Sequence, residues 1–162
     1  MQRKSQAALE FLTTYAWAFI VILIVVAAIS YFGILRPQKI LPDRCNFNVG
    51  FDCQSYTAGL AGNFNLRLRN GLGQTITVTG ISLSTEAATG LSGCTIATPT
   101  LPYTNWASGN ITDLTWSACN FAGSGFARGD KAKIFVRMDY FDTKAGSVYA
   151  HIAEGEIFTT IT

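Results

Sequence analysis

The chain has 162 residues, of which 49% are hydrophobic and only 14% are charged, and its formal net charge is +2. Two of the positive charges, Arg3 and Lys4, lie at the N-terminus, and the side-chain charges beyond Lys4 balance. This pattern excludes a basic surface for nucleic acid and an acidic disordered segment, so we expect no nucleic-acid partner. The low content of charged residues favours close packing against other copies.

The N-terminal segment predicts a membrane-inserted helix. A run of 25 uncharged residues extends from Phe11 to Leu35 and is long enough to cross a bilayer. We place the helix at residues 6–35, a length of about 45 Å at ~1.5 Å per residue. Pro37 cannot continue a helix, so residues 36–44 are predicted to form a linker and residues 45–162 an exported domain.

Two ordinary explanations of this segment leave one residue unexplained. A cleaved secretory signal has an apolar core of about 7–15 residues, which is shorter than this one. A plain signal anchor fits the length, and its basic head would stay cytoplasmic under the positive-inside rule. Neither kind of segment requires Glu10. The residue needs an explanation because a carboxylate toward the middle of a membrane helix costs about 2.5–3.5 kcal/mol on insertion. The cost is smaller near the headgroups, so a tolerated interfacial residue is the simplest alternative.

The residues around Glu10 resemble a known processing site. The segment RKS-QAALEF, residues 3–11, resembles the class III signal peptide of archaeal type IV pilins. The resemblance implies that a prepilin peptidase cuts on the cytoplasmic side, between Ser5 and Gln6, and leaves the helix attached. Residues 1–5 would then be a cleaved leader. Glu10 would be the fifth residue of the mature chain, where pilins carry a glutamate.

The resemblance also implies a role for Glu10 in assembly. Cleavage creates a new α-amino group at Gln6, which is ordinarily charged at neutral pH. In a bundle of helices, this amine would pair with Glu10 of a neighbouring subunit and set the axial register, since either charge is costly to bury alone. The implied partners are other copies in a helical filament, the prepilin peptidase, a pilus assembly ATPase with its membrane platform, and the membrane before assembly.

An aromatic stripe on the helix indicates packing. Phe11, Tyr15 and Phe19 recur at i, i+4 spacing and therefore share one helix face. Helix–helix contact in a filament and contact with lipid would both produce such a composition. The stripe is a candidate helix-packing surface under either alternative.

Four cysteines lie beyond the helix. An even number in an exported domain is typical of disulfides, and four cysteines allow three connectivities. Short sequence separation favours the pairs Cys45–Cys53 and Cys94–Cys119. Zinc binding is disfavoured because no pair has CxxC spacing and the one histidine, His151, is distant in sequence.

Beyond the linker, the hydrophobic period changes from helical to two, which is typical of strands. Side chains alternate at residues 64–69 and 133–141, residues 75–84 are rich in β-branched types, and two closing strands follow at 148–153 and 157–161. Several strands with short polar turns predict an antiparallel, immunoglobulin-like β-sandwich. The expected fold class is therefore α+β, with a long hydrophobic helix followed by this sandwich head.

The middle of the head is less regular. Residues 86–125 are predicted to form long loops with one or two short strands. Trp106 and Trp116 in this region are candidates for core anchors or for subunit contacts, and the core is favoured for Trp116.

Motifs that carry chemistry are few. Asn110-Ile111-Thr112 is the one N-x-S/T sequon of the sequence, so Asn110 is a candidate N-glycosylation site. The tripeptide at residues 128–130 (RGD) is interpreted as a turn, and a structural or surface role is favoured for His151. HExxH, GxSxG and GxxxxGK[ST] motifs are absent from the sequence. We therefore expect no enzymatic activity, no cofactor and no metal site.

These patterns favour a structural pilin subunit of an archaeal type IV pilus-like filament on the cell surface. Adhesion would be a property of the repeated outer surface of the polymer. The alternative from a different class is a single-pass membrane-anchored β-sandwich that binds a sugar or a surface protein and never polymerises. An archaellin, the subunit of the rotating filament, and a minor or priming pilin are further alternatives.

Overall fold

The computed structural model describes residues 2–31, 41–60, 62–85, 91 and 94–162; within the helix it describes the side chains of Glu10 and of residues 13–31. The chain divides into two compact units, Met1–Leu41 and Pro42–Thr162. We describe each unit by itself. Residues 32–35 of the expected helix and residues 36–40 of the expected linker lie outside the described residues.

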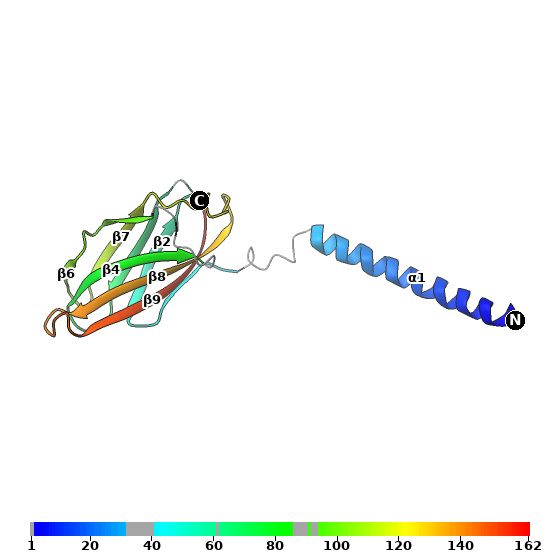
Figure 1. The fold of residues 1–162 in the computed structure, drawn as a ribbon, viewed down its shortest axis with the longest axis horizontal. Coiled ribbons are helices and arrows are strands. Elements are labelled where there is room, and N and C mark those ends of the chain that lie inside the picture. The colour runs from blue at the N-terminus through cyan, green and yellow to red at the C-terminus, as the bar shows by residue number, and fades with distance from the viewer. Residues whose placement is uncertain (1, 32–40, 61, 86–90, 92–93) are drawn as a thin grey trace. The chain divides into compact units, whose positions relative to one another are not determined.

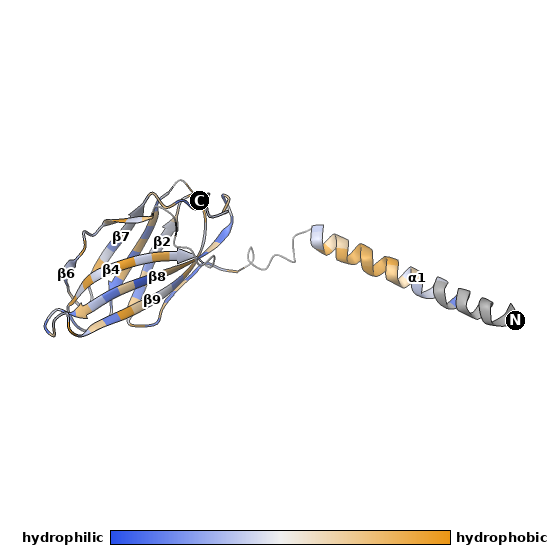
Figure 2. Cartoon of the chain, in the orientation of Figure 1, coloured by the Kyte–Doolittle hydropathy of each residue, from blue (hydrophilic) through white to orange (hydrophobic). Residues whose placement is uncertain are grey.

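The first unit contains α1 (Gln2–Tyr31), a helix of 30 residues (Figure 1). Its sequence has no glycine or proline, the two residues that most disfavour a helix interior. Within it, Thr13–Tyr31 has a mean hydropathy of 2.2 and is long enough to cross a membrane. Figure 2 shows this apolar stretch as the orange part of α1. The helix begins ahead of Gln6, so residues 2–5 are continuous with it.

The second unit is a sandwich of two antiparallel sheets that enclose one core (Figure 1). Sheet A has the strand order β1-β9-β8-β4-β6, and sheet B has the order β2-β3-β7-β5. The strands are β1 (Arg44–Phe47), β2 (Phe51–Ala58), β3 (Phe64–Asn70), β4 (Ile76–Thr85), β5 (Thr95–Thr98), β6 (Tyr103–Trp106), β7 (Ile111–Ser117), β8 (Lys131–Asp142) and β9 (Ala150–Thr160).

The strand order is that of an immunoglobulin-like domain. In chain order, β2, β3, β4, β7, β8 and β9 take the positions of strands A, B, C, E, F and G, which form the sheets A-B-E and G-F-C. β5 lies at the position of strand D, and β6 lies beside β4 as strand C′ does in variable domains. This sandwich departs from that pattern in that β6 follows β5 in the chain. The expectation of an antiparallel, immunoglobulin-like sandwich is confirmed.

The core follows from the alternation of side chains along the strands. In β3, Phe64, Leu66 and Leu68 are buried, whereas the residues between them are exposed. The inner residues of β8 and β9 meet this face from sheet A. Burying one large apolar side chain contributes about 1.5–3 kcal/mol relative to leaving it exposed. Trp106 and Trp116 are each only 1% exposed, so both tryptophans are core residues.

The middle region contains more strand than the sequence suggested. The expectation of loops with one or two short strands at residues 86–125 is wrong, because β5, β6 and β7 all lie there. β7 has seven residues and buries Leu114 and Trp116 between exposed neighbours. Its pairing with β3 on one side and β5 on the other makes it an interior strand of sheet B. Residues 86–90 and 92–93 of this region lie outside the described residues.

Two disulfides cross-link the head. Cys45–Cys53 joins β1, at an edge of sheet A, to β2, at an edge of sheet B, with 6.1 Å between the Cα atoms. Cys94–Cys119 joins the residue before β5 to a loop after β7, with 4.0 Å between the Cα atoms. These are the pairings that short sequence separation favoured.

Candidate functional site

The surface of α1 is apolar on more than one face. Tyr15 and Phe19 are 60% and 61% exposed and share a face through their i, i+4 spacing. Trp17 is 71% exposed and lies on a different side of the helix, since two residues turn an α-helix by about 200°. A helix that is hydrophobic all round needs an apolar environment such as lipid or other helices. The side chain of Phe11, the third member of the stripe, lies outside the described residues.

Polar groups near the start of this surface are partly satisfied within the helix. The hydroxyls of Thr13 and Thr14 donate to the main-chain carbonyl of Glu10, at 3.0 and 2.8 Å. Such bonds let threonine lie in an apolar helix without an unpaired hydroxyl. The Glu10 side chain is exposed. Ser5 and Gln6 lie in α1, and the expected pairing of the Gln6 amine with Glu10 joins two chains, so it stays a prediction.

An ion-pair cluster lies where the chain from the helix joins the sandwich. Arg44 at the start of β1 donates to Glu156 in β9 at 2.8 Å, and Lys133 in β8 lies 3.3 Å from the other oxygen of Glu156. Lys131 contacts Asp43 just before β1. Desolvation raises the pKa of the Glu156 carboxyl, but hydrogen bonds from Arg44 and Lys133, and the charges of these residues, outweigh it and lower the pKa below its usual range. These contacts hold the first residues of the head against sheet A.

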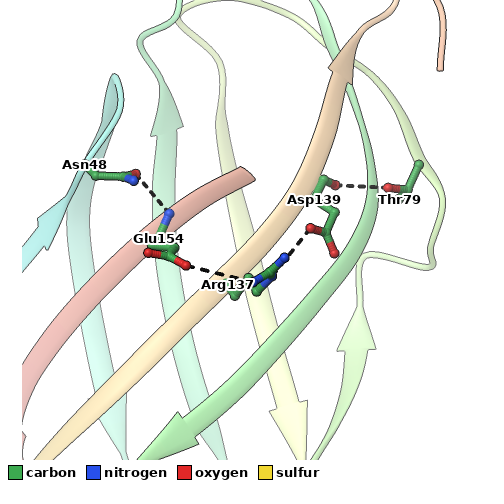
Figure 3. A network of polar contacts seen from close by, with 5 residues as sticks. All are labelled: Asn48, Thr79, Arg137, Asp139 and Glu154. Carbon is green, nitrogen blue, oxygen red and sulfur yellow. Dashed lines mark hydrogen bonds and ion pairs between the residues drawn. The ribbon is translucent and has the colours of Figure 1, made fainter. Parts of the chain in front are cut away.

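A second polar network covers the outer face of sheet A (Figure 3). Arg137 lies between Asp139, at 3.6 Å, and Glu154, at 3.9 Å. The main-chain N–H of Glu154 donates to the Asn48 side chain at 2.9 Å, and the Thr79 hydroxyl donates to the Asp139 carbonyl at 3.1 Å. Arg137 and Glu154 are more than half exposed, so their pairing adds little stability. Arg137 and Glu154 also line a shallow hollow of about 280 Å³ formed by residues of β4, β8 and β9.

The outer face of sheet B carries a polar hollow of about 410 Å³. Arg67 in β3 donates two hydrogen bonds to Asp113 in β7, at 2.6 and 2.8 Å, and these bonds lower the pKa of Asp113. Asn65 donates to the Thr57 hydroxyl at 3.3 Å. The hollow therefore offers hydroxyl, amide, guanidinium and carboxylate groups, the set of groups that contact polar ligands such as sugars.

The other motifs of the sequence lie apart from these clusters. Asn110 is exposed in the turn between β6 and β7. Gly129 has φ +86°, and the Asp130 carboxylate accepts the Ala127 N–H at 2.8 Å, so the RGD tripeptide is part of a turn. His151 is exposed on β9, with its ring 5.7 Å from that of Tyr140. Among the described residues, no group of three His, Cys, Asp or Glu side chains is placed to hold a metal ion.

Comparisons with known proteins identify only distant structural similarity. No protein-family model matches the chain, and no curated protein matches it. Among solved structures, the chain is similar to the periplasmic chaperone SfaE, with a TM-score of 0.44 and 7% identity over 74% of this chain. It spans 57% of that protein's length. A similarity this distant supports no conclusion about activity, partners or assembly.

Proposed function

We propose that the chain is a structural pilin subunit that polymerises through α1 into an archaeal type IV pilus-like extracellular filament. One observation carries the proposal: a long helix with exposed apolar side chains on several faces has a single carboxylate, Glu10, at the start of its apolar stretch. A plain membrane anchor tolerates that charge near the headgroups but does not require it. A helix that moves from lipid into a helical bundle of subunits needs an apolar surface and an interaction that fixes its axial register.

The mechanism begins with the leader. The prepilin peptidase hydrolyses the peptide bond between Ser5 and Gln6, which gives Gln6 a free α-amino group. As an assembly ATPase and its membrane platform move the subunit out of the lipid, the amine meets Glu10 of a neighbour. Each group is costly to desolvate alone, so helices whose amine and carboxylate do not meet are disfavoured. The apolar faces of the helices then pack against one another in place of lipid.

Two features of the head fit an extracellular location in such a polymer. Its two disulfides need an oxidising compartment to form and persist. Its sandwich has a complete core of its own, so it does not need α1 to bury apolar surface. Adhesion follows from the repetition of the outer faces of the sandwich along the filament, which multiplies weak contacts into avidity.

The N-terminus of the native protein is the first test. Mass spectrometry of protein from membranes and shed filaments should find Gln6 as the first residue, because the leader is removed before assembly. An intact Met1 in filament material would overturn the proposal.

The second test substitutes the carboxylate. Glu10→Ala should insert into the membrane at the normal level but yield few or no filaments, whereas Glu10→Asp, which keeps the charge, should restore part of the yield. Electron microscopy measures the yield and the axial register. Filaments of normal yield and register from Glu10→Ala would show that no pairing through this residue is needed.

A membrane-anchored binding module is the second candidate, favoured by the polar hollow over Arg67 and Asp113. In that case the chain would keep Met1, remain monomeric in detergent, and bind a polar ligand at sheet B. Asp113→Ala would then abolish ligand binding without changing the N-terminus or the oligomeric state.

A further inference from the structure

The turn between β6 and β7 presents an exposed asparagine on a fixed backbone. The main-chain N–H of Asn110 donates to the Ala107 carbonyl at 3.2 Å. Its own carbonyl accepts two hydrogen bonds, from the indole N–H of Trp106 at 3.0 Å and from the main-chain N–H of Asn70 at 3.0 Å. Since Trp106 and Asn70 are buried, both anchors of the Asn110 backbone lie in the core.

Asn70 holds the rest of the turn in place. Its side-chain amide donates to the main-chain carbonyls of Trp106 and Gln74, each at 2.9 Å, and its main-chain carbonyl accepts the N–H of Gly109 at 2.6 Å. Gly109 has φ +80°, a conformation that a residue with a Cβ rarely adopts, and this lets the turn close directly before Asn110. The main-chain N–H and carbonyl of Asn110 are therefore both bonded within the turn, whereas the residue as a whole is exposed.

The side chain itself has no structural task. Within the described part of the chain, the side-chain amide of Asn110 makes no hydrogen bond, and the residue is exposed. The next residue, Ile111, is 54% exposed on the outer face of β7, so an apolar group lies uncovered beside the amide. The hydroxyl of Thr112 is 3.1 Å from the Tyr103 hydroxyl, which places the third sequon residue at the base of the turn.

The turn lies at the end of the head opposite the start of β1. Trp106 pairs with Ile76, which also pairs with Asp142 at the end of β8. Arg44, the first residue of β1, pairs instead with Phe158 near the end of β9, at the other end of sheet A. A group attached to Asn110 therefore does not obstruct the segment through which the head joins the rest of the chain.

From this geometry we infer that Asn110 is an N-glycosylated residue and that the glycan covers Ile111. The inference rests on the proposed function only in requiring an exported head. The proposed donor is an oligosaccharide on a polyprenyl phosphate or diphosphate. The Asn110 Nδ2 forms a bond to the anomeric carbon and loses one proton to a base of the transferase. The bond from that carbon to the phosphate oxygen breaks, and its electron pair leaves with the lipid phosphate.

The test is the mass of the native full-length protein and of its peptide containing residues 107–113. Protein from membranes of its own cells should exceed the sequence mass by whole sugar residues, and the excess should map to Asn110. Asn110→Gln and Thr112→Val should each remove the whole excess. Thr112→Ser, which keeps the sequon, should retain it.

A matched control separates the sequon from the local hydrogen bond. Thr112→Val removes both the sequon and the bond to Tyr103, whereas Tyr103→Phe removes the bond alone. Tyr103→Phe should therefore keep the glycan. Loss of the glycan in Tyr103→Phe with retention in Thr112→Val would overturn the inference.

The outcome is separable from that of the proposed function. Protease treatment of intact cells reports whether the head is outside, and the N-terminal residue reports processing. An external head that begins at Gln6 and carries an unmodified Asn110 overturns the glycosylation and leaves the pilin proposal standing. A modified Asn110 on a chain that keeps Met1 supports the glycosylation and overturns the pilin proposal.

Discussion

Asn70 donates its side-chain amide to the main-chain carbonyl of Trp106 across 2.9 Å, and both residues are buried. The same side chain accepts the N–H of Leu72 at 3.0 Å. A buried polar group at this position is favourable only while these partners are in place, because each buried group left unpaired costs about 1–3 kcal/mol.

Asn70→Ala should therefore lower the free energy of unfolding by about 2–4 kcal/mol, since it leaves several main-chain groups without partners. Asn65→Ala on the same strand is the control. Its hydrogen bond to Thr57 is exposed, so it should change stability by less than about 0.5 kcal/mol. Denaturant unfolding of the head measures both. Equal effects would show that Asn70 acts only through local backbone propensity.

The head should lose stability in acid through Glu156. Its pKa in the folded state lies below the usual 4.5, so its carboxylate contributes stability at pH values above 4.5. That contribution disappears as the pH falls through the lowered pKa of the folded state. Glu156→Gln should have a shallower loss of unfolding free energy below pH 4.5 than the parent. An unchanged slope would mean that other carboxylates dominate the acid transition.

The two disulfides should contribute unequally. Cys94–Cys119 closes a loop with a sequence separation of 25, and Cys45–Cys53 one of 8. Loop-closure entropy predicts losses of about 3.5 and about 2.5 kcal/mol on replacing the two pairs with serine. Thermal and denaturant unfolding of the two double variants would give the order. A larger loss for the shorter loop would show that the cross-link between the sheets stabilises the folded state itself.

The head should fold without the helix. Residues 42–162 form one compact unit with a continuous core and both disulfides. Produced in an oxidising compartment, this fragment should be a monomer with one cooperative unfolding transition, as expected for a small domain. Sedimentation and calorimetry test this. A fragment that aggregates or lacks a transition would indicate that the head needs α1 to complete its surface.

Local pattern was sufficient for the strands whose side chains alternate clearly. Phe64, Leu66 and Leu68 alternate with polar residues, and each is buried in β3 as the pattern predicted. β7 alternates as well, but its first inward-facing residue is Thr112 and turn-forming residues precede it, so its apolar signal comes from Leu114 and Trp116 alone. The four-residue strands β5 and β6 are too short to show a period.

The polar clusters could not be predicted, because they depend on the pairing of distant strands. Arg44 and Glu156 are separated by 112 residues and meet only when β1 pairs with β9. Arg67 and Asp113 meet because β3 and β7 are neighbours, although Arg67 precedes the irregular middle region of residues 86–125 and Asp113 lies within it. The alternation of side chains within a strand does not identify the strand that pairs with it.

The bond between Cys45 and Cys53 has a mechanical consequence for a head that is tethered through its N-terminal side. Cys45 is the second residue of β1, so tension arriving along the chain meets a covalent cross-link after Arg44. From there the load divides between β1 in one sheet and β2 in the other. Separation of β1 from β9 would lengthen the chain very little, because the disulfide still joins Cys45 to Cys53. Both sheets are pulled as one body, and the hydrophobic interior between them resists the strain.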